Sequence, residues 1–358
     1  MKKTLLALAV LAASGASFAQ SSVTLFGIVD ATLAFGRGDV SNLQRLTNSG
    51  LNSSRLGFKG TEDLGGGMNA GFWLEAGVNN DDGTGSATNM NNQPVAAFNA
   101  TSGANAPVRA GTQGLTFNRR SIVTLGGGFG EVRLGRDYTP TFYNTSNYDA
   151  FGTNGVGTSI VAVKAWGLES ESLRASNSIS YLLPSNLGGF GGQVSYMMGE
   201  NASTGAKDGN GLQARGSFDQ GPISVGVAYG VTKRTTGDSK VTNFGASYDL
   251  GAAKLMGMYS QDKIGSLTGK GFNLGVTAPV GAGLIRATYG SYKTDAAGTP
   301  KTNQFALGYV HNLSKRTALY TTIARTSNSG GASQALNGAV TSANGSSTGY
   351  DFGVRHSF

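Results

Sequence analysis

The chain has 358 residues, with abundant glycine (57), little proline (7) and no cysteine. The lack of cysteine excludes a disulfide framework and a thiolate metal site. Abundant glycine with little proline is typical of strands joined by tight turns, whereas a disordered linker would be rich in proline. With 39% apolar residues and a mean hydropathy of −0.14, hydropathy alone would predict a soluble protein. The same values suit a membrane β-barrel, because polar lumen-facing residues dilute the apolar ones.

Residues 1–19 have the pattern of a cleaved signal peptide. Lys2 and Lys3 precede the apolar stretch Leu5–Ala13, and Ser17-Phe18-Ala19 supplies the small residues that signal peptidase needs. A membrane anchor is the alternative, but roughly 10 apolar residues are too few to span a bilayer. No later segment reaches the roughly 18 consecutive apolar residues of a transmembrane helix. We therefore expect an exported mature chain of residues 20–358.

The formal charge of +8 falls to +6 when Lys2 and Lys3 leave with the signal. A basic balance is compatible with nucleic acid, with anionic lipid or with a cationic channel interior. Because the basic residues are dispersed and the protein is expected to be exported, we do not expect nucleic acid as a partner.

From Val23 onwards, apolar and polar residues alternate with a period of two. In the segment 23–33, Val23, Leu25, Val29 and Leu33 share one face, and Thr24, Asp30 and Thr32 share the other. The same alternation recurs at 212–218, 223–230 and 304–309. A period of two over about 10 residues predicts strands whose two faces meet different environments.

Two kinds of connection join these predicted strands. Seven are short and rich in glycine, near 64–67, 126–130, 185–189, 219–222, 250–252, 280–283 and 313–316. Eight are longer and variable, near 37–52, 80–117, 138–173, 201–209, 234–239, 264–269, 295–300 and 328–346. Fifteen connections imply sixteen antiparallel strands. An even number of strands can close into a barrel, and sixteen make it wide enough for an aqueous channel. Strands of this length use the whole chain and leave no residues for a second domain. The loops 80–117 and 138–173 are longer than ordinary connections, and such loops are usually functional.

Five stretches resemble the Gram-negative general porins of the β-proteobacterial and neisserial type. They are SSVTLFGIVDA at 21–31, SRLGFKGTEDLGGG at 54–67, LGRDYTP at 134–140, RASNSISY at 174–181 and GVRHSF at 353–358. The resemblance implies an all-β, sixteen-stranded transmembrane barrel with short periplasmic turns and long extracellular loops, three to a trimer in the outer membrane. It also implies that the third long loop, 138–173, folds into the lumen as a constriction loop.

The function implied is passive diffusion of ions and small hydrophilic solutes through a water-filled channel. Expected partners are two further copies of the chain, outer-membrane lipid and lipopolysaccharide, the barrel assembly machinery, and small hydrophilic solutes and anions. Phe358 resembles the C-terminal signal that the assembly machinery reads, and it is also compatible with an aromatic residue at the membrane interface. The small outward residues Gly27, Val29 and Ala31 are compatible with trimer packing.

Selectivity in such a channel depends on the charges that line it. Residues whose neighbours are apolar and outward must point inward, which places Arg55, Lys59, Arg120 and Arg133 in the lumen; Arg174 has the same parity if its strand begins early enough. By the same rule, Arg215, Arg286, Arg355, Asp30, Glu75 and Asp249 also face inward. The inward set is mainly cationic, which predicts a modest preference for anions.

Arg136 has outward parity, where lipid would penalise it by roughly 2–4 kcal/mol at mid-depth. We expect the strand to bend at Gly135 and Arg136 to turn inward. In the loop 138–173, Asp149, Glu169 and Glu171 are candidate constriction acids that would oppose the basic wall, with Lys164 as the one internal base. Glu169 and Glu171 are equally compatible with a solvated position at the end of the loop.

Other functions have less support in the sequence. An outer-membrane hydrolase would need histidine on the loop side, but the two histidines, His311 and His356, lie near predicted periplasmic turns. No catalytic residue, cofactor site or metal site is expected. The pair Asp81-Asp82 is more typical of a solvated loop than of a Ca²⁺ site. A substrate-specific channel and an adhesion barrel with a plugged lumen remain alternatives, which conductance would distinguish.

Overall fold

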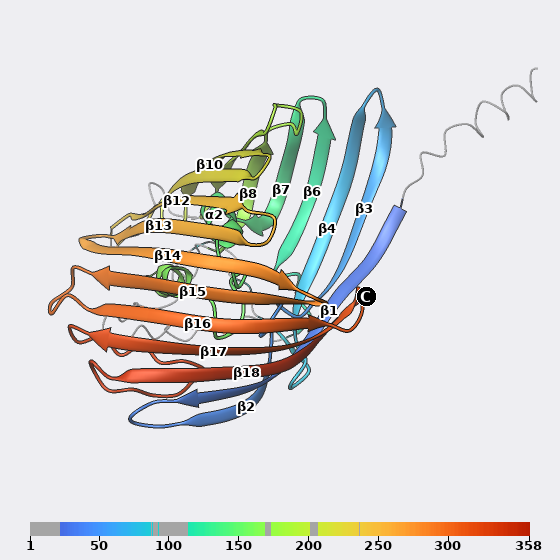
Figure 1. The fold of residues 1–358 in the computed structure, drawn as a ribbon. Coiled ribbons are helices and arrows are strands. Elements are labelled where there is room, and N and C mark those ends of the chain that lie inside the picture. The colour runs from blue at the N-terminus through green and yellow to red at the C-terminus, as the bar shows by residue number, and fades with distance from the viewer. Residues whose placement is uncertain are drawn as a thin grey trace, which may run out of the picture.

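The computed structural model describes residues 22–86, 88, 92, 114–168, 173–200, 207–235 and 237–358. Most of these residues form one closed antiparallel sheet (Figure 1). The strands are β1 (Ser22–Arg37), β2 (Leu43–Asn48), β3 (Arg55–Gly65), β4 (Met68–Asn79), β5 (Thr84–Gly85), β6 (Arg120–Gly127), β7 (Gly130–Tyr138), β8 (Arg174–Leu182), β9 (Phe190–Met197), β10 (Gly211–Gln220), β11 (Ile223–Thr232), β12 (Ser239–Asp249), β13 (Lys254–Ile264), β14 (Leu267–Val280), β15 (Gly283–Thr294), β16 (Lys301–Asn312), β17 (Thr317–Ser329) and β18 (Ser346–Ser357). Helices α2 (Pro140–Asn147) and α3 (Ile160–Leu168) lie between β7 and β8.

The eighteen strands occupy sixteen positions in the wall. Residues 22–28 of β1 pair with β3 and residues 31–36 pair with β2, so β2 and β3 together fill one position. β5 pairs with the end of β4 inside a loop, while the wall continues from β4 to β6. The barrel closes where β1 pairs with β18. The predicted sixteen-stranded barrel is confirmed, but the expected first loop at 37–52 is wrong, because it contains β2.

Residues 49–54 separate β2 from β3 and form an inward excursion of the wall. The Asp30 carboxylate accepts hydrogen bonds from the backbone N–H groups of Leu51 (2.8 Å) and Asn52 (2.6 Å). Thr32 Oγ1 accepts another from the Gly50 N–H at 3.0 Å. The N–H groups of residues 50–52 have no partner strand here, and the inward side chains of β1 accept their hydrogen bonds instead. These bonds hold the excursion against the wall.

The predicted alternation between the two faces is present along the strands. On β17, the outward Leu319 is 45% exposed and the inward Thr326 is fully buried. Val227, Leu274 and Phe305 on other strands are also half exposed on the outer face. In water, such a surface would cost about 25 cal/mol per Å² of apolar area. The outer face therefore suits lipid, and the inner face carries the polar side chains.

Short turns join the strands at one end of the barrel. The turn between β3 and β4 contains Gly65, Gly66 and Gly67, with φ values of 78°, 63° and 78°. Glycine adopts this left-handed conformation without the steric cost that other residues incur. The long loops lie at the opposite end, as expected from the two kinds of connection.

Residues 139–168 follow β7 and pack against the inner face of the barrel (Figure 1). Thr139 caps α2 by accepting a hydrogen bond from the Phe142 N–H at 3.2 Å, and Pro140 follows at the first helical position. α2 contacts β10, β11 and β12, whereas α3 contacts β13, β14 and β15. The buried apolar clusters around Tyr148 and Phe151 lie between this segment and the wall. The hydrophobic core is therefore inside the barrel, beneath the loop.

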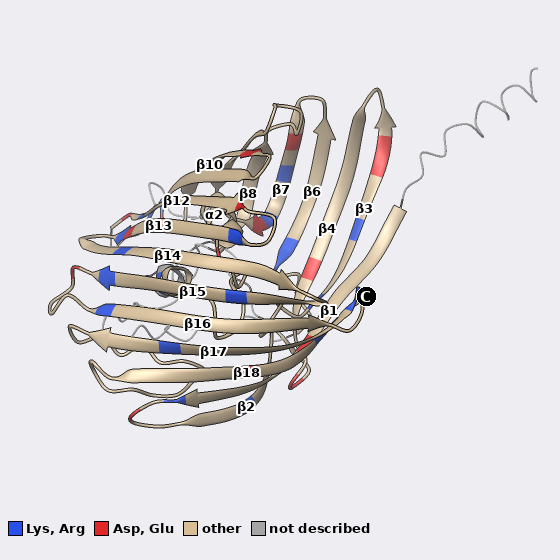
Figure 2. Ribbon diagram, viewed as in Figure 1, with Lys and Arg blue, Asp and Glu red and all other residues tan. Residues whose placement is uncertain are grey.

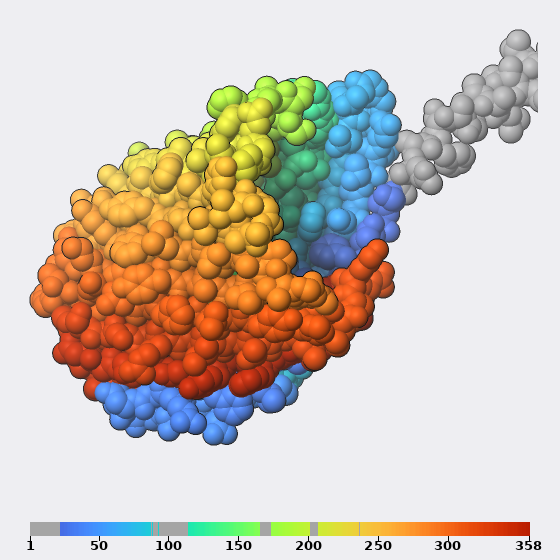
Figure 3. Space-filling view, viewed as in Figure 1, coloured from blue at the N-terminus to red at the C-terminus, as the bar shows by residue number. Residues whose placement is uncertain are grey.

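Neither helix is long and apolar enough to cross a membrane, within the part of the chain that the structure describes. Figure 3 shows a hollow between the light-blue and teal strands β3 to β7 and the orange strands β13 to β15.

Candidate permeation site

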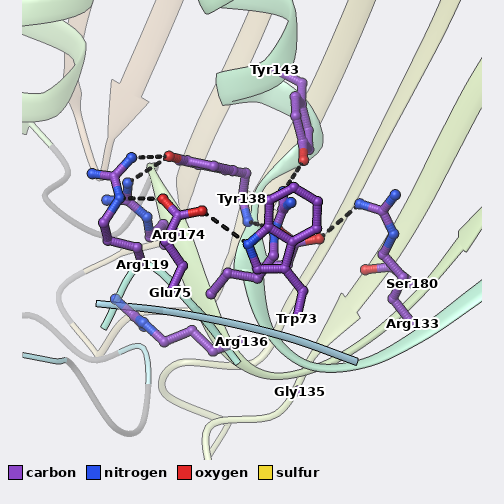
Figure 4. A network of polar contacts seen from close by, with 12 residues as sticks. Trp73, Glu75, Arg119, Arg133, Gly135, Arg136, Tyr138, Tyr143, Arg174 and Ser180 are labelled. Atoms are coloured by element: carbon purple, nitrogen blue, oxygen red, sulfur yellow. Dashed lines mark hydrogen bonds and ion pairs between the residues drawn. The ribbon is translucent and has the colours of Figure 1, made fainter. Parts of the chain in front are cut away.

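Six basic side chains converge on the inner face of β3, β6, β7 and β8, and we call this set the basic wall. Its members are Arg55, Lys59, Arg119, Arg120, Arg133 and Arg174. The charged bands of these strands are visible in Figure 2, and Figure 4 shows the network that several of the residues form. Three carboxylates, Glu75, Glu131 and Asp137, belong to the same network, which leaves a formal charge of +3.

Glu75 on β4 holds the part of the basic wall nearer the loops. Its Oε1 forms ion pairs with Arg119 Nε and with Arg55 Nη1, the latter at 3.3 Å. Its Oε2 accepts a hydrogen bond from Trp73 Nε1 at 3.0 Å. The residue is 2% exposed. A buried carboxylate of this kind is stable only when it is paired, so Glu75 and its partners depend on one another.

Asp137 at the end of β7 holds the second part of the basic wall. Its Oδ1 accepts from Arg120 Nε at 2.7 Å, and its Oδ2 accepts from Arg133 Nη1 at 2.9 Å. Arg133 Nε also pairs with Glu131. Because Arg133, Gly135 and Asp137 share one parity, alternation could have placed Asp137 in the lumen, although we had not singled it out.

Two tyrosines connect the basic wall to the start of the loop. The Tyr138 hydroxyl accepts from Arg119 Nη2 at 2.6 Å and from Arg174 Nη2 at 2.8 Å, and the Arg174 guanidinium lies 4.4 Å from the Tyr138 ring centre. Tyr143 on α2 accepts from Arg120 Nη2. Burial and the nearby Asp137 raise the pKa of Tyr143, so its hydroxyl stays protonated. Arg119 escaped sequence reasoning because it precedes β6 and has the parity opposite to that of Arg120.

The inner face of β9 to β17 has a different composition, and we call it the neutral wall. Its buried residues are mainly hydroxyl and amide side chains: Gln193, Ser195, Gln213, Asn243, Ser260, Asn273, Thr288, Gln304, Thr322 and Thr326. Several of them bind the loop. Asn144 Nδ2 on α2 donates to Asn243 Oδ1 at 2.8 Å, and Gln304 Nε2 donates to the Val156 carbonyl at 3.1 Å. The loop therefore lies against the neutral wall.

The arginines expected on the lumen face of this half of the barrel lie beneath or beside the loop. Arg215 Nε donates to Asn144 Oδ1 at 3.2 Å. The Arg286 guanidinium lies 4.5 Å from the ring centre of Phe151, and Arg286 is 5% exposed. These two side chains support the loop from the neutral wall, whereas the basic wall contacts it only near its start, through Tyr138 and Tyr143, among the contacts described here.

Arg136 differs from the expectation. The strand does bend at Gly135, whose φ is +127° and where the pairing with β8 shifts register. Arg136, however, pairs with Ser121 on the face of Leu134, and its guanidinium donates to the Asn118 carbonyl at 2.6 Å and to Ser176 Oγ at 2.8 Å. Figure 4 shows it to one side of the network. These polar partners stabilise the guanidinium group on the outward face. The inward orientation that we expected for Arg136 is therefore wrong.

Asp149 also differs from the expectation. Its carboxylate accepts backbone hydrogen bonds from Phe151 (2.9 Å), Thr153 (3.2 Å) and Ser159 (3.1 Å), and the residue is 5% exposed. Burial raises its pKa, while these hydrogen bonds oppose the rise. Asp149 therefore organises the loop and does not line the lumen. Glu169 and Glu171 lie outside the described residues. Lys164 on α3 is half-buried, and burial lowers its pKa to about 8.

The last residue lies at the seam of the barrel. The backbone N–H and carbonyl of Phe358 exchange hydrogen bonds with Gly27 at 3.0 and 3.1 Å. A Cβ atom on Gly27 would lie 2.2 Å from the Phe358 ring, so the ring covers the glycine. Phe358 is 45% exposed, which suits a residue at the outer surface. Its role as an assembly signal stays a prediction.

With this geometry in place, comparison with known proteins identifies the family. A family model described as a Gram-negative porin matches residues 4–331. The chain belongs to the Gram-negative porin family. This porin is 40% identical to outer membrane porin protein 32 of Delftia acidovorans over the full length of both chains. It is 28% identical to an outer membrane porin protein of Bordetella pertussis, covering 89% of this chain and 93% of the relative.

Solved structures agree with this assignment. An anion-selective porin from Comamonas acidovorans superposes with a TM-score of 0.81 at 38% identity, covering 95% of this porin and 100% of that chain. A trimer form of OmpT from Vibrio cholerae shares the fold, with a TM-score of 0.65 at 13% identity over 94% of this porin and 99% of that chain. The resemblance that we drew from the five stretches is confirmed. This porin is a β-barrel of the bacterial outer membrane and forms a channel.

Proposed function

We propose that this porin is a general diffusion channel with a modest preference for anions, and that solutes pass between the basic wall and the segment 139–173. The observation that carries the proposal is the formal charge of +3 on the basic wall. Selectivity in channels follows the sign of the lining charges and the pore radius. Three of six cations are neutralised by acids in the same network, so the preference is modest rather than strict. The anion-selective porin from Comamonas acidovorans supports the sign.

The segment 138–173 is the proposed constriction. Its anchors on the neutral wall hold most of it on that side of the lumen, while Tyr143 at its start contacts Arg120. This arrangement supports a passage beside the basic wall. Asp149 does not contribute an acidic face to that passage, because its carboxylate is used within the loop. A transverse field therefore depends mainly on the basic wall itself.

We further infer that the functional unit is a homotrimer assembled through the small outward residues of β1, Val29 and Ala31, with the Phe358 ring covering Gly27 between them and the turn end of the strand. The trimer form of OmpT supports this arrangement. Removal of residues 1–19 on export, recognition of Phe358 by the barrel assembly machinery, and contacts with outer-membrane lipid and lipopolysaccharide belong to the same proposal.

We also infer that the protein catalyses no reaction. His311 and His356 are exposed at the turn end of the barrel, where they contact Tyr309 and Thr317. Among the described residues, no three acidic, histidine or cysteine side chains form a group that could hold a metal ion.

Reconstitution into a planar bilayer tests the proposed function. We expect large, steady conductance steps and, under a KCl gradient, a reversal potential weighted toward chloride. A potential weighted toward potassium would overturn the anion preference. Silence in this assay, with correctly folded protein in the bilayer, would favour an adhesion barrel with a plugged lumen.

A further inference from the structure

A cavity of about 320 Å³ opens on the inner face of the barrel between the basic wall and the turns. It is lined by β1, β3, β4, β6 and β7, and its charged and aromatic residues are Lys59, Phe72, Trp73, Arg120, Glu131 and Arg133. Most of the remaining lining consists of hydroxyl side chains, including Thr24 and Thr124. We call this cavity the Trp73 niche.

Strand register determines which side chains border the niche. Lys59 pairs with Trp73, and Trp73 pairs with Ile122, so these residues form one row across the inner face. One step nearer the turns, Thr61 pairs with Gly71 and Gly71 pairs with Thr124. A Cβ atom at Gly71 would lie 2.8 Å from Thr124 Oγ1, so the Thr124 side chain occupies the space above this glycine. The hydroxyl side chains of Thr61 and Thr124 therefore border the niche on the side nearer the turns, next to Trp73.

Lys59 differs from the arginines around the niche. Arg120 and Arg133 are both paired with Asp137. Lys59 forms no ion pair with any carboxylate of the described residues, and its side chain is exposed. Its Nζ lies 5.1 Å from the Trp73 ring centre and 5.7 Å from that of Phe26. The two rings stand edge to face, 5.3 Å apart.

The niche thus presents an uncompensated ammonium group directly beside an aromatic surface. An ammonium group attracts a carboxylate, and an indole ring favours an offset or edge-to-face contact with another ring. A simple inorganic anion uses only the first of these groups. A planar ring that carries a carboxylate uses both at once.

We propose that the Trp73 niche binds small aromatic carboxylates on their way through the channel, with the ring against Trp73 and the carboxylate on Lys59 Nζ. This inference rests on the proposed function, because the niche lies on the proposed passage. It deepens that function by naming a substrate class that the channel retains more strongly than other monoanions of similar size.

The experiment compares benzoate with cyclohexanecarboxylate and acetate in single-channel recordings. Cyclohexanecarboxylate has the same charge and similar bulk but no aromatic ring. We expect benzoate to reduce the chloride current with a half-saturating concentration about twofold to tenfold below that of cyclohexanecarboxylate. Trp73→Leu removes this difference. Lys59→Met weakens both carboxylates by about fivefold, whereas Lys315→Met, in a periplasmic turn outside the niche, changes neither.

Two outcomes would overturn the inference. One is equal half-saturation by benzoate and cyclohexanecarboxylate in a wild-type channel that still shows a chloride-weighted reversal potential; the proposed function then stands and only the niche fails. The other is an equal effect of Lys315→Met and Lys59→Met.

A readout without current separates the niche from the channel proposal. Trp166→Phe leaves Trp73 as the single tryptophan of the chain. We expect 4-nitrobenzoate to quench its fluorescence saturably in folded protein, and Lys59→Met to raise the half-saturating concentration. Quenching that is linear in concentration and insensitive to Lys59→Met would contradict binding, whether or not the protein conducts.

Discussion

The basic wall and the neutral wall lie on opposite sides of one lumen. The first presents charged groups to the lumen, and the second binds the polar backbone of the loop. The basic wall keeps charges at the lumen by pairing each buried acid with two guanidinium groups, as Glu75 does with Arg55 and Arg119. The neutral wall must bury the polar backbone of the loop, and it does so with uncharged groups such as Asn243 and Gln304. Burying an unpaired charge beneath a loop would cost far more than burying a hydrogen-bonded amide. Arg286 is charged and buried beneath the loop, where its guanidinium packs against the Phe151 ring. The other anchors named here are uncharged, and the paired charges gather on the basic wall.

The largest expected effect comes from removing an acid of the basic wall. Glu75→Gln leaves Arg55 and Arg119 without their carboxylate, and breaking a buried pair in this way costs about 3–5 kcal/mol. On the neutral wall, Ser195→Ala removes one hydroxyl group and costs about 1 kcal/mol. Unfolding of the purified barrel in denaturant measures both values. Equal losses for the two variants would mean that the two walls do not differ in the way we describe.

The second prediction reverses one charge of the basic wall. Arg120→Glu lowers the formal charge of the network from +3 to +1 and places a new carboxylate beside Asp137. We expect the anion-to-cation permeability ratio to fall by about tenfold before salt screening is considered. Arg133→Glu should act in the same direction, and folding should remain intact. The measurement is the reversal potential under a KCl gradient.

The matched control for this prediction is Lys315→Glu, which makes the same charge change in a turn outside the lumen. If the control shifts the reversal potential as much as Arg120→Glu does, the selectivity comes from overall charge and not from the basic wall.

The third prediction loosens the loop without changing any charge. Asn243→Leu removes the acceptor of Asn144 and the donors to the Thr141 carbonyl and Thr145 Oγ1. Leaving these groups unpaired costs about 1–3 kcal/mol. We expect faster hydrogen exchange in α2 and noisier open-channel current, with an unchanged reversal potential. Asn312→Leu, which affects only a turn-side contact with Ala282, should leave the exchange in α2 unchanged.

The smallest expected effect is a pH dependence from the loop. Burial lowers the pKa of Lys164 to about 8, so this side chain carries its charge below that pH and loses it above. Anion preference should therefore decrease slightly between pH 7 and pH 9, because one positive charge on the loop disappears. Lys164→Met should show the lower preference at every pH and no change across this range. A wild-type channel whose preference rises with pH would contradict the sign.

Sequence reasoning recovered the parts of the structure that depend on local pattern. Alternation and the two kinds of connection gave the sixteen wall positions, and the parity of apolar neighbours placed Arg120 and Arg133 on the face where they meet Asp137. The alternation assigns faces reliably in this barrel, because a polar side chain facing lipid or an apolar side chain facing water costs free energy.

Other residues could not be placed because their partners are distant in sequence. Arg136 is satisfied by Asn118 and Ser176, and no local pattern reveals that pair. Asp149 has the composition of a lumen acid, but its carboxylate binds the backbone of its own loop. β2 was missed within the expected loop 37–52 because its apolar residues, Leu43 and Leu46, are three positions apart and do not alternate with polar ones.

The break between β2 and β3 also fixes how the loop can behave. Ser53 Oγ donates to Asn154 Oδ1 at 2.8 Å, and a Cβ atom on Gly155 would lie 2.1 Å from the Gly50 carbonyl oxygen, so the loop tip is seated on the excursion. The excursion is itself a piece of the second wall position, tied to β1 through Asp30. The loop could move away only if residues 49–54, which are part of the wall, also moved. We therefore expect the width of the lumen to be fixed by the closed sheet and not by a hinge in the loop.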